Sequence, residues 1–363
     1  MIPFLDLSRI HSPLKQELLD EIGLLIDKSE FVLGDSVENF EIEFARFCNT
    51  KFCISVNSGT SALHLALLSL GIGPGDEVIV PSMTFVATAA AVSYTGATPK
   101  FVDVDPDTWN IDVSKIEAAI TSRTKCIIPV HLHGLMADMP SIMEIARNSK
   151  LFVIEDAAQA HGAAIEGQRA GSFGHLACFS FYPGKNLGAL GEGGAVVTDD
   201  EELRERIKLL RNWGSKNKYI HDVLGFNNRL ESLQAVALGI KLKHLENWTS
   251  LRQKAALQYE ELLQSTTFST CTVPTGYKHV RHIFAIRANK RKEVAEIFSQ
   301  FGIGWGIHYP VPLHLQPIYR HLNYQPGDLP VCELLGKELL SLPLFPGIQV
   351  DEIETVCKVL TGL

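Results

Sequence analysis

The stretch KFCISVNSGTSALHLALLSL, residues 51–70, contains a β-rich run, four small residues and a helical pattern in direct succession. The same order of strand, turn and helix recurs from about residue 50 to residue 200. Strands that alternate with helices form a mostly parallel sheet with helices on both faces. We therefore expect an α/β fold whose ligand crevice lies at the carboxyl ends of the strands. The runs that read as strands are KFCISV, EVIVP, KFVDV, KCIIPV, LFVIED, ACFSFY and GAVVT.

The pattern changes after residue 230. The segment that begins ESLQAVALGIKLKHLENW predicts long helices that leave the sheet. Beyond it, STCTVP and HIFAIRA read as strands, whereas NKRKEVAEIFSQF and VDEIETVCKVLTGL read as helices. We therefore expect a large domain over residues 1–245 and a smaller C-terminal α+β domain over residues 246–363.

Composition narrows the class of protein. The 363 residues carry a net charge of −8, and nucleic acids and anionic membranes favour basic surfaces, so neither is expected as a partner. No apolar run approaches the roughly 20 residues of a membrane-spanning helix, and no signal peptide is visible. The seven cysteines include no CxxC pair, which argues against a disulfide framework or a zinc site. We expect a cytoplasmic protein that acts on small molecules.

One lysine, Lys185, lies among glycine and aromatic residues in FSFYPGKNLGALGEGG, residues 179–194. A solvated lysine normally lies among other charges. A phosphate-binding loop would need GxxxxGK followed by Ser or Thr, but Asn186 follows here. The position of Lys185 therefore indicates a functional amine, with an ordinary surface lysine in a turn as the alternative.

Three other stretches should meet Lys185 at the same edge of the sheet. In NSGTSALHLAL, the N–H groups at a helix start can bind a phosphate, although an ordinary capped helix fits as well. LFVIEDAAQAHGA ends a strand in Glu155 and Asp156, and only one of them can face the site because neighbouring strand residues point in opposite directions. The alternative for such an acid is a helix cap. In PSMTFVATAAAV, Phe85 can cover a planar ring or pack in the core.

A lysine amine, a phosphate cradle, a carboxylate and an aromatic face together meet the needs of pyridoxal 5′-phosphate (PLP). The amine forms an imine with the aldehyde of PLP, and the carboxylate keeps the pyridine nitrogen protonated. The combination carries more weight than any of the four parts alone. We therefore expect PLP, or its amino form PMP, as the cofactor.

The ordered motifs of the chain resemble the DegT/DnrJ/EryC1/StrS family of PLP-dependent nucleotide-sugar aminotransferases, a branch of the aspartate aminotransferase (fold type I) architecture. The resemblance covers nearly the whole chain and implies a cytoplasmic homodimer with shared active sites. It also implies amino transfer from L-glutamate to a nucleotide-linked keto sugar, such as a dTDP- or UDP-hexose. The motifs are IPFLDL, FVLG, NSGTSALHLAL, EDAAQAHGA, FSFYPGKNLGALGEGG, GFNNRL and IHYPVPLHLQPIY.

The resemblance also implies roles for individual residues. Lys185 would bind the cofactor covalently and move protons between its carbon and that of the substrate. His308 and Tyr309 would lie near the sugar or its diphosphate, although Tyr309 before a proline can also simply shape an extended loop. The implied cofactor contacts are Gly59, Thr60 and Ser180 at the phosphate, Phe85 on the ring, Asp156 at the pyridine nitrogen, Gln159 at the ring hydroxyl, and Asn227 of the partner subunit, with Asn228 and Arg229 as alternatives for the last.

The resemblance also bears on the chemistry within the family. The segment GIGWGIHYPVPLHLQPIY is more similar to members acting on 3-keto sugars than to those acting on 4-keto sugars, so we expect transfer at C3. Members that catalyse dehydration carry histidine in place of the lysine, so Lys185 favours amino transfer. Glu192 fits the aminotransferase pattern too, although capping a turn explains it equally well. A regulator without catalysis would be expected to lack Lys185 or Asp156. His131 and His133 share one face of a strand-like run, but no third ligand is nearby, so no metal is expected.

Overall fold

The computed structural model of the protein describes residues 1–362, and its centre is one seven-stranded sheet. Every strand predicted between residues 50 and 200 is present in it. The strands are β1 (Phe52–Val56), β2 (Glu77–Pro81), β3 (Thr98–Val102), β4 (Thr124–Ile127), β5 (Phe152–Asp156), β8 (Leu176–Ser180) and β9 (Gly194–Thr198). Their order across the sheet is β1-β9-β8-β5-β4-β2-β3.

The direction of the strands agrees with the predicted fold class. Strand β9 runs antiparallel to both of its neighbours, β1 and β8. All the other neighbouring pairs in the sheet are parallel. The prediction of a mostly parallel α/β sheet is confirmed.

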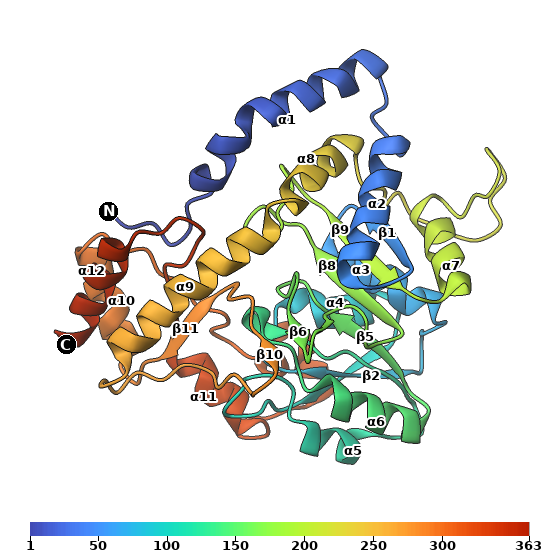
Figure 1. Cartoon of the computed structure of the whole chain (residues 1–363). Helices are drawn as coiled ribbons and strands as arrows, with labels where there is room; N and C mark the ends of the chain where they lie inside the picture. Colours follow the sequence, from blue (N-terminus) through green and yellow to red (C-terminus); the bar gives the residue numbers. More distant parts are fainter. Residues whose placement is uncertain (363) are drawn as a thin grey trace.

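Helices cover both faces of this sheet (Figure 1). Alternate strand residues supply the two cores: Val153 packs in a cluster with side chains of α2, α6 and α8, whereas Ile154 packs in a cluster with those of α3 and α4. Strands buried on both faces require continuous apolar runs, which explains the composition of the seven segments. The helices around the sheet are α2 (Asp35–Cys48), α3 (Gly59–Ser69), α4 (Val86–Tyr94), α5 (Ile116–Ala119), α6 (Met139–Ser149), α7 (Glu201–Arg211) and α8 (Ser232–Leu242).

Several of these helices begin at side chains that cap their free N–H groups. Ser58 Oγ accepts from the N–H of Ser61 at the start of α3, at 3.1 Å. Asp200 Oδ1 accepts from two N–H groups of the first turn of α7. Such caps satisfy donors that have no partner inside the helix. The cap at Ser58 therefore allows α3 to begin directly after β1, at the edge of the sheet.

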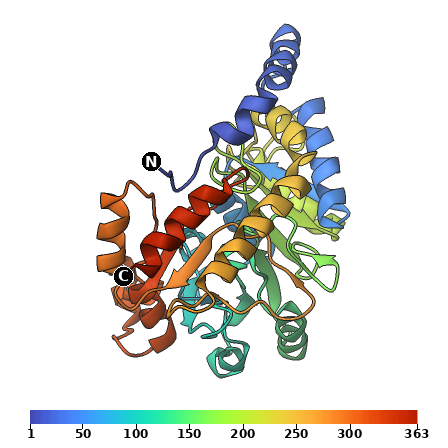
Figure 2. The same cartoon turned by 60° about the vertical axis from the view of Figure 1, so that its left-hand side comes forward.

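Helix α9 (Leu245–Leu263) leads from the sheet to the C-terminal elements, as Figures 1 and 2 both show. There, β11 (Phe284–Arg287) and β12 (Leu339–Leu342) form a two-stranded antiparallel sheet. It packs in one apolar cluster with α9, α10 (Arg291–Gln300) and α12 (Val350–Thr361). The predicted smaller α+β part is present, and a boundary near residue 245 stays a proposal.

One predicted strand, STCTVP, is wrong. Only Ser269 of this run makes an isolated β-bridge, to Arg287. Its apolar Cys271 is buried, but a single bridged residue does not build a strand. The chain also contains α11 (Pro330–Glu338) and a three-stranded sheet of β10 (Tyr277–Lys278), β6 (Ala164–Ile165) and β7 (Gln168–Arg169).

The N-terminal residues join the two parts of the chain. Ile2 exchanges backbone hydrogen bonds with the segment around Ile303, including Gly304 N–H to Ile2 O at 2.7 Å. The chain then enters α1 (Ser8–Lys28), which packs on α8 through Leu14 and Leu18 and extends beyond the rest of the molecule (Figure 1).

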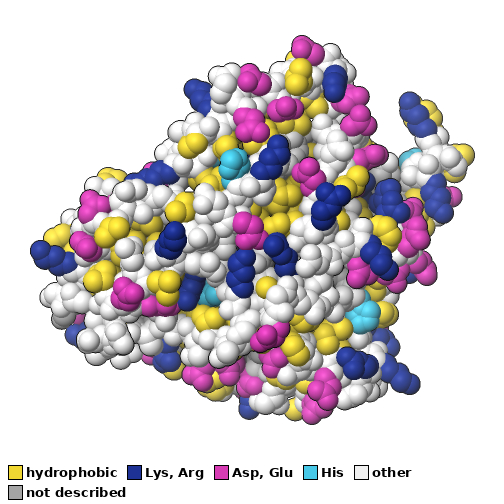
Figure 3. All heavy atoms as spheres, in the orientation of Figure 1, with side chains coloured by type: hydrophobic (Ala, Val, Ile, Leu, Met, Phe, Trp, Pro, Cys, Tyr) yellow, Lys and Arg dark blue, Asp and Glu magenta, His cyan; other side chains and the backbone are white. Residues whose placement is uncertain are grey.

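The surface has no single-sign character on the face drawn in Figure 3, where basic and acidic side chains are interspersed. Within residues 1–362, no helix combines the length and the apolar character needed to cross a bilayer.

Candidate active site

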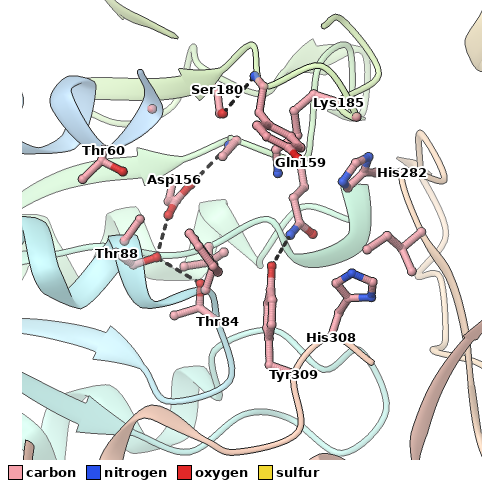
Figure 4. Close-up of a pocket in the computed structure, with 18 of the residues that line it drawn as sticks. Thr60, Thr84, Thr88, Asp156, Gln159, Ser180, Lys185, His282, His308 and Tyr309 are labelled. Atoms are coloured by element: carbon pink, nitrogen blue, oxygen red, sulfur yellow. Dashed lines mark hydrogen bonds between the residues drawn. The ribbon is translucent and has the colours of Figure 1, made fainter. Parts of the chain in front are cut away.

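A cavity of about 610 Å³ lies at the carboxyl ends of the central strands. Residues from widely separated parts of the sequence line it, and Figure 4 shows them around one space. Of the ten residues proposed from the sequence, the cavity brings together nine: Gly59, Thr60, Phe85, Asp156, Gln159, Ser180, Lys185, His308 and Tyr309. The tenth, Asn227, does not line the cavity of its own chain.

Lys185 lies in a tight loop that follows β8. The loop is closed at its base by a 2.8 Å hydrogen bond from Ala189 N–H to Phe181 O. A Cβ at Gly188 would lie 2.3 Å from the carbonyl oxygen of Pro183, so only glycine permits this loop path. The loop thereby directs the side chain of Lys185 into the cavity (Figure 4).

The environment of Lys185 makes its amine easier to deprotonate than that of a solvated lysine. Burial lowers the pKa of its amine to about 8, and the nearby carboxylate of Asp156 opposes that shift. Within residues 1–362, no hydrogen-bond partner holds its Nζ atom. The amine is therefore partly deprotonated and unengaged near neutral pH, as a nucleophile or base must be.

Asp156 faces the cavity from the end of β5. Its Oδ2 accepts a 2.7 Å hydrogen bond from Thr88 Oγ1, and its Oδ1 accepts one from Ala158 N–H at 3.2 Å. Since the single hydroxyl proton of Thr88 is donated to the carboxylate, Thr84 Oγ1 must donate to Thr88 Oγ1, 3.0 Å away. Burial raises the pKa of Asp156, so its charge depends on such donors and on nearby cations.

Glu155 points to the opposite side of the sheet, as the alternation of strand residues requires. Its buried carboxylate accepts hydrogen bonds from the N–H groups of Gly171, Phe173 and Gly174, all at 2.8–2.9 Å. It also accepts one from His131 Nε2 at 2.9 Å. Glu155 is therefore a structural anchor, and Asp156 is the acid that reaches the cavity.

The start of α3 forms a cradle for an anion. The side chain of Ser180 packs directly against Gly59, where an added Cβ would lie 2.7 Å from the Ser180 Cβ. The N–H groups of Gly59 and Thr60 stand in the first turn of the helix, where no carbonyl of the helix can reach them. These two N–H groups and the Ser180 hydroxyl line the cavity together, which suits a phosphate.

Gln159 is held by the residues around it. Its Oε1 accepts from His133 N–H at 2.6 Å, and its Nε2 donates to the Tyr309 hydroxyl at 3.2 Å. The ring of Phe85 lies beside that of Tyr309, with centroids 5.8 Å apart, and it lines the cavity rather than the core. Burial lowers the pKa of His308 to about 4, so its imidazole is neutral at physiological pH.

Asn227 pairs with Asn212 in an isolated β-bridge near the end of α7. Arg229, one of its alternatives, donates to Asn212 Oδ1 at 2.8 Å. Neither residue lines the cavity of its own chain. The role of Asn227 in a partner's site stays a prediction.

The two histidines considered as metal ligands, His131 and His133, form hydrogen bonds within the protein instead. They lie beyond β4, in and before a 3₁₀ turn, and not on one face of a strand as the sequence suggested. Ala137 N–H donates to His131 Nδ1, so the neutral ring carries its proton on Nε2 and donates it to Glu155. Within residues 1–362, no three His, Cys, Asp or Glu side chains are placed to hold a metal ion.

The sequence analysis missed several residues of this cavity. Thr88 lies in the first turn of α4, shortly after the end of β2, and that position near a strand end could have pointed to the cavity. His282 and Arg252 come from the C-terminal half of the chain, and nothing in their local sequence signals the cavity. Figure 4 shows His282 on the side of the cavity opposite Asp156.

Lys241 supports the lysine loop from outside the cavity. Its buried amine donates a 2.7 Å hydrogen bond to the carbonyl of Gly188 and contacts His11 Nε2 at 2.9 Å. Burial lowers the pKa of Lys241 to about 8. Through this contact, α1 and α8 both hold the loop that carries Lys185.

Comparisons with known proteins agree with this geometry. The chain is 48% identical over 359 residues to UDP-N-acetyl-3-dehydro-alpha-D-glucosamine 3-aminotransferase of Acidithiobacillus ferrooxidans, covering 99% of this chain and 97% of that protein. It superposes with a TM-score of 0.97 and 44% identity on DesV of Streptomyces venezuelae, solved in complex with a ketimine intermediate, covering 99% and 98% of the two chains.

A third similar protein was solved with a cofactor in place. NtdA of Bacillus subtilis, with bound PMP, superposes with a TM-score of 0.93 and 32% identity, covering 99% of this chain and 84% of that one. The family model of the DegT/DnrJ/EryC1/StrS aminotransferases matches residues 13–361. This match and the 48% identity to the Acidithiobacillus protein show that the chain belongs to the DegT/DnrJ/EryC1/StrS aminotransferase family.

Proposed function

We propose that this protein is a PLP-dependent aminotransferase that moves an amino group from L-glutamate to C3 of a nucleotide-linked 3-keto hexose. The observation that carries this proposal is the meeting of the Lys185 amine, the Asp156 carboxylate and the first-turn N–H groups of α3 around one cavity. Each group alone has a structural explanation. Together they match the aldehyde, the ring nitrogen and the phosphate of PLP.

The residues present fit PLP. The amine of Lys185 has no partner in residues 1–362, and the N–H groups of Gly59 and Thr60 are available. Gly59 lies so close to Ser180 that any side chain at position 59 would collide with it. When bound, PLP supplies an aldehyde that carries the amino group and a ring that accepts electrons. The residues that would hold it are Lys185 at the aldehyde, Gly59, Thr60 and Ser180 at the phosphate, Asp156 and Gln159 at ring heteroatoms, and Phe85 on the ring face.

Lys185 is the group that moves protons in this proposal. Its Nζ would take a proton from the substrate carbon that bears the amino group and return one on the cofactor side. A pKa of about 8 places both protonation states within reach at physiological pH, which suits an amine that acts in turn as base and acid.

Asp156 provides the fixed negative charge. Thr88 and Ala158 hold its two oxygens, so the carboxylate has one orientation toward the cavity. Its burial raises its pKa in the protein alone, and a cation placed against it would lower that pKa again. A protonated ring nitrogen is such a cation.

The sugar side of the site is proposed to include His308 and Tyr309. Tyr309 is held by Gln159, and the carbonyl of His308 accepts a 3.2 Å hydrogen bond from His133 Nε2. The assignment to C3 is supported by the segment around these residues and by the Acidithiobacillus relative, whose name specifies a 3-aminotransferase. A homodimer in which Asn227 of the partner subunit reaches the cavity belongs to the same proposal.

The test follows the visible absorbance of the bound cofactor in the pyridoxal form. Parallel samples receive a nucleotide-linked 3-amino sugar or its 4-amino isomer, and a third sample receives L-glutamate. Loss of the band with the 3-amino sugar and with L-glutamate supports the proposal. Loss with the 4-amino isomer alone overturns the assignment to C3, and no loss with either sugar overturns the proposed substrate class.

A further inference from the structure

Arg252 is a buried cation without a counter-ion. It lies on α9, only 2% of its surface is exposed, and it lines the same cavity as Lys185. Its Nη1 donates to the carbonyls of Leu344 and His282, at 2.9 and 3.3 Å. Its Nε is buried and has no hydrogen-bond partner within residues 1–362.

The other two buried arginines, Arg211 and Arg281, each form an ion pair with a carboxylate. Arg211 contacts the carboxylate of Glu41 at 2.5 Å, and Arg281 contacts that of Glu260 at 2.6 Å. A buried charge normally has such a partner, because removing it from water costs several kcal/mol otherwise. Among residues 1–362, no carboxylate takes this place at Arg252. Its two bonds to neutral carbonyls leave the charge uncompensated.

The position of Arg252 in the cavity indicates which anion can compensate it. Arg252 contacts the backbone of His282, and both residues line the cavity together with Lys185. An amino donor must bring its nitrogen to the cofactor beside Lys185, and its α-carboxylate is bonded to the same carbon. The diphosphate of a 3-keto nucleotide sugar, in contrast, is separated from the reacting carbon by part of the sugar ring.

We infer that Arg252 is the binding residue for the α-carboxylate of the amino donor. This inference rests on the proposed function, since it concerns the first substrate of that reaction. A guanidinium presents two N–H groups side by side to a carboxylate, and lysine cannot reproduce this fork. Arg252 thus distinguishes the amino acid, which carries a carboxylate next to its amino group, from the amino sugar, which does not.

The experiment compares the natural protein with Arg252→Lys and Arg252→Gln in the cofactor-loaded form. Lysine keeps the charge, and glutamine keeps a planar donor for the carbonyl of Leu344. The matched control is Arg291→Lys, because Arg291 Nη1 also donates to two backbone carbonyls, those of Gly336 and Leu339, but lies outside the cavity. Three quantities are measured: half-saturation by L-glutamate, half-saturation by the nucleotide-linked amino sugar, and the dissociation constant of glutarate, an unreactive dicarboxylate.

For L-glutamate, and to a similar degree for glutarate, both Arg252 variants should weaken binding by about 10- to 150-fold, the equivalent of one charge-assisted hydrogen-bonded contact. Half-saturation by the amino sugar should stay within about twofold, and the control should change none of the three quantities. If binding of glutamate and of the amino sugar is weakened equally, Arg252 has a purely structural role and the inference is overturned. Unchanged binding of glutamate would overturn it as well.

The glutarate titration separates this inference from the proposed function. If the natural protein transfers no amino group in either half-reaction, the proposed function is wrong. Glutarate binding that is weakened in the Arg252 variants would still support an anion site at Arg252. Glutarate binding that is absent in the natural protein, or unchanged in the variants, would overturn it.

Discussion

Thr88→Val should weaken the binding of PLP without unfolding the protein. The Thr88 hydroxyl donates a 2.7 Å hydrogen bond to Asp156 Oδ2, and both side chains are buried. Valine has nearly the shape of threonine, so the change removes this bond and little packing. The carboxylate keeps only the longer bond from Ala158 N–H, at 3.2 Å.

The size of the effect follows from the charge of the acceptor. A hydrogen bond to an ionised group contributes about 1.5–3 kcal/mol, compared with about 1 kcal/mol for a neutral pair. Loss of that contribution raises the pKa of Asp156 further, because the Thr88 hydrogen bond is one of the contacts that oppose the effect of burial. Because the ionised carboxylate is the form that would bind a protonated ring nitrogen, the dissociation constant of PLP should rise by about 10- to 100-fold.

The assay is a PLP titration followed by absorbance, together with a thermal melt of the apoprotein. The matched control is Thr95→Val, at the end of the same helix, where the buried hydroxyl donates to Val92 O at 2.8 Å. That change should lower stability by about 1 kcal/mol and leave PLP affinity unchanged. If Thr88→Val folds and binds PLP within about twofold of the natural protein, the Thr88 hydroxyl does not sustain the charge of Asp156, and the reasoning fails.

Three further predictions concern single groups. Lys185→Ala should melt within a few degrees of the natural protein, because no group within residues 1–362 holds its amine by a hydrogen bond, and should lose turnover by more than about a thousandfold. Normal turnover would contradict the proposed mechanism. Glu155→Gln should lower the free energy of unfolding by about 3–5 kcal/mol, because a buried carboxylate with four donors is broken; an unchanged urea midpoint would contradict the anchor role. Burial lowers the pKa of His133 to about 3 and that of His308 to about 4. Between pH 6.5 and pH 4 the unfolded chain therefore binds more protons than the folded protein. The free energy of unfolding should decrease as the pH is lowered through this range, by up to about 1.4 kcal/mol per pH unit for each ring. Melting temperatures from pH 7 to pH 4.5 test this, and a constant value would contradict it.

Much of the fold could be predicted from local patterns. The seven strand runs are short and rich in Val, Ile and Phe, and most of their residues are buried in the structure. The prediction was wrong for STCTVP, which has a strand-like composition but pairs with another strand only through the β-bridge of Ser269. A strand is defined by pairing, and pairing is a property of the whole chain.

The antiparallel direction of strand β9 could not be predicted from the sequence either. Its sequence, GAVVT, is as apolar as the parallel strands, yet it runs antiparallel between β1 and β8. Direction depends on how the loop that carries Lys185 returns to the sheet, and no local periodicity records that path.

The sequence by itself determined the alternation of strands and helices and the residues that follow strand ends, among them Gly59, Asp156 and Lys185. These residues lie together because the carboxyl ends of parallel strands meet at one edge, so a single rule sufficed. The tertiary structure alone decided which acid faces the cavity, how Thr88 orients it, and that Arg252 and His282 arrive from the other half of the chain. The physical reason is that strand ends are ordered by local geometry, whereas the burial, charge and partners of a side chain depend on distant segments, as with Thr88, which lies 68 residues before Asp156.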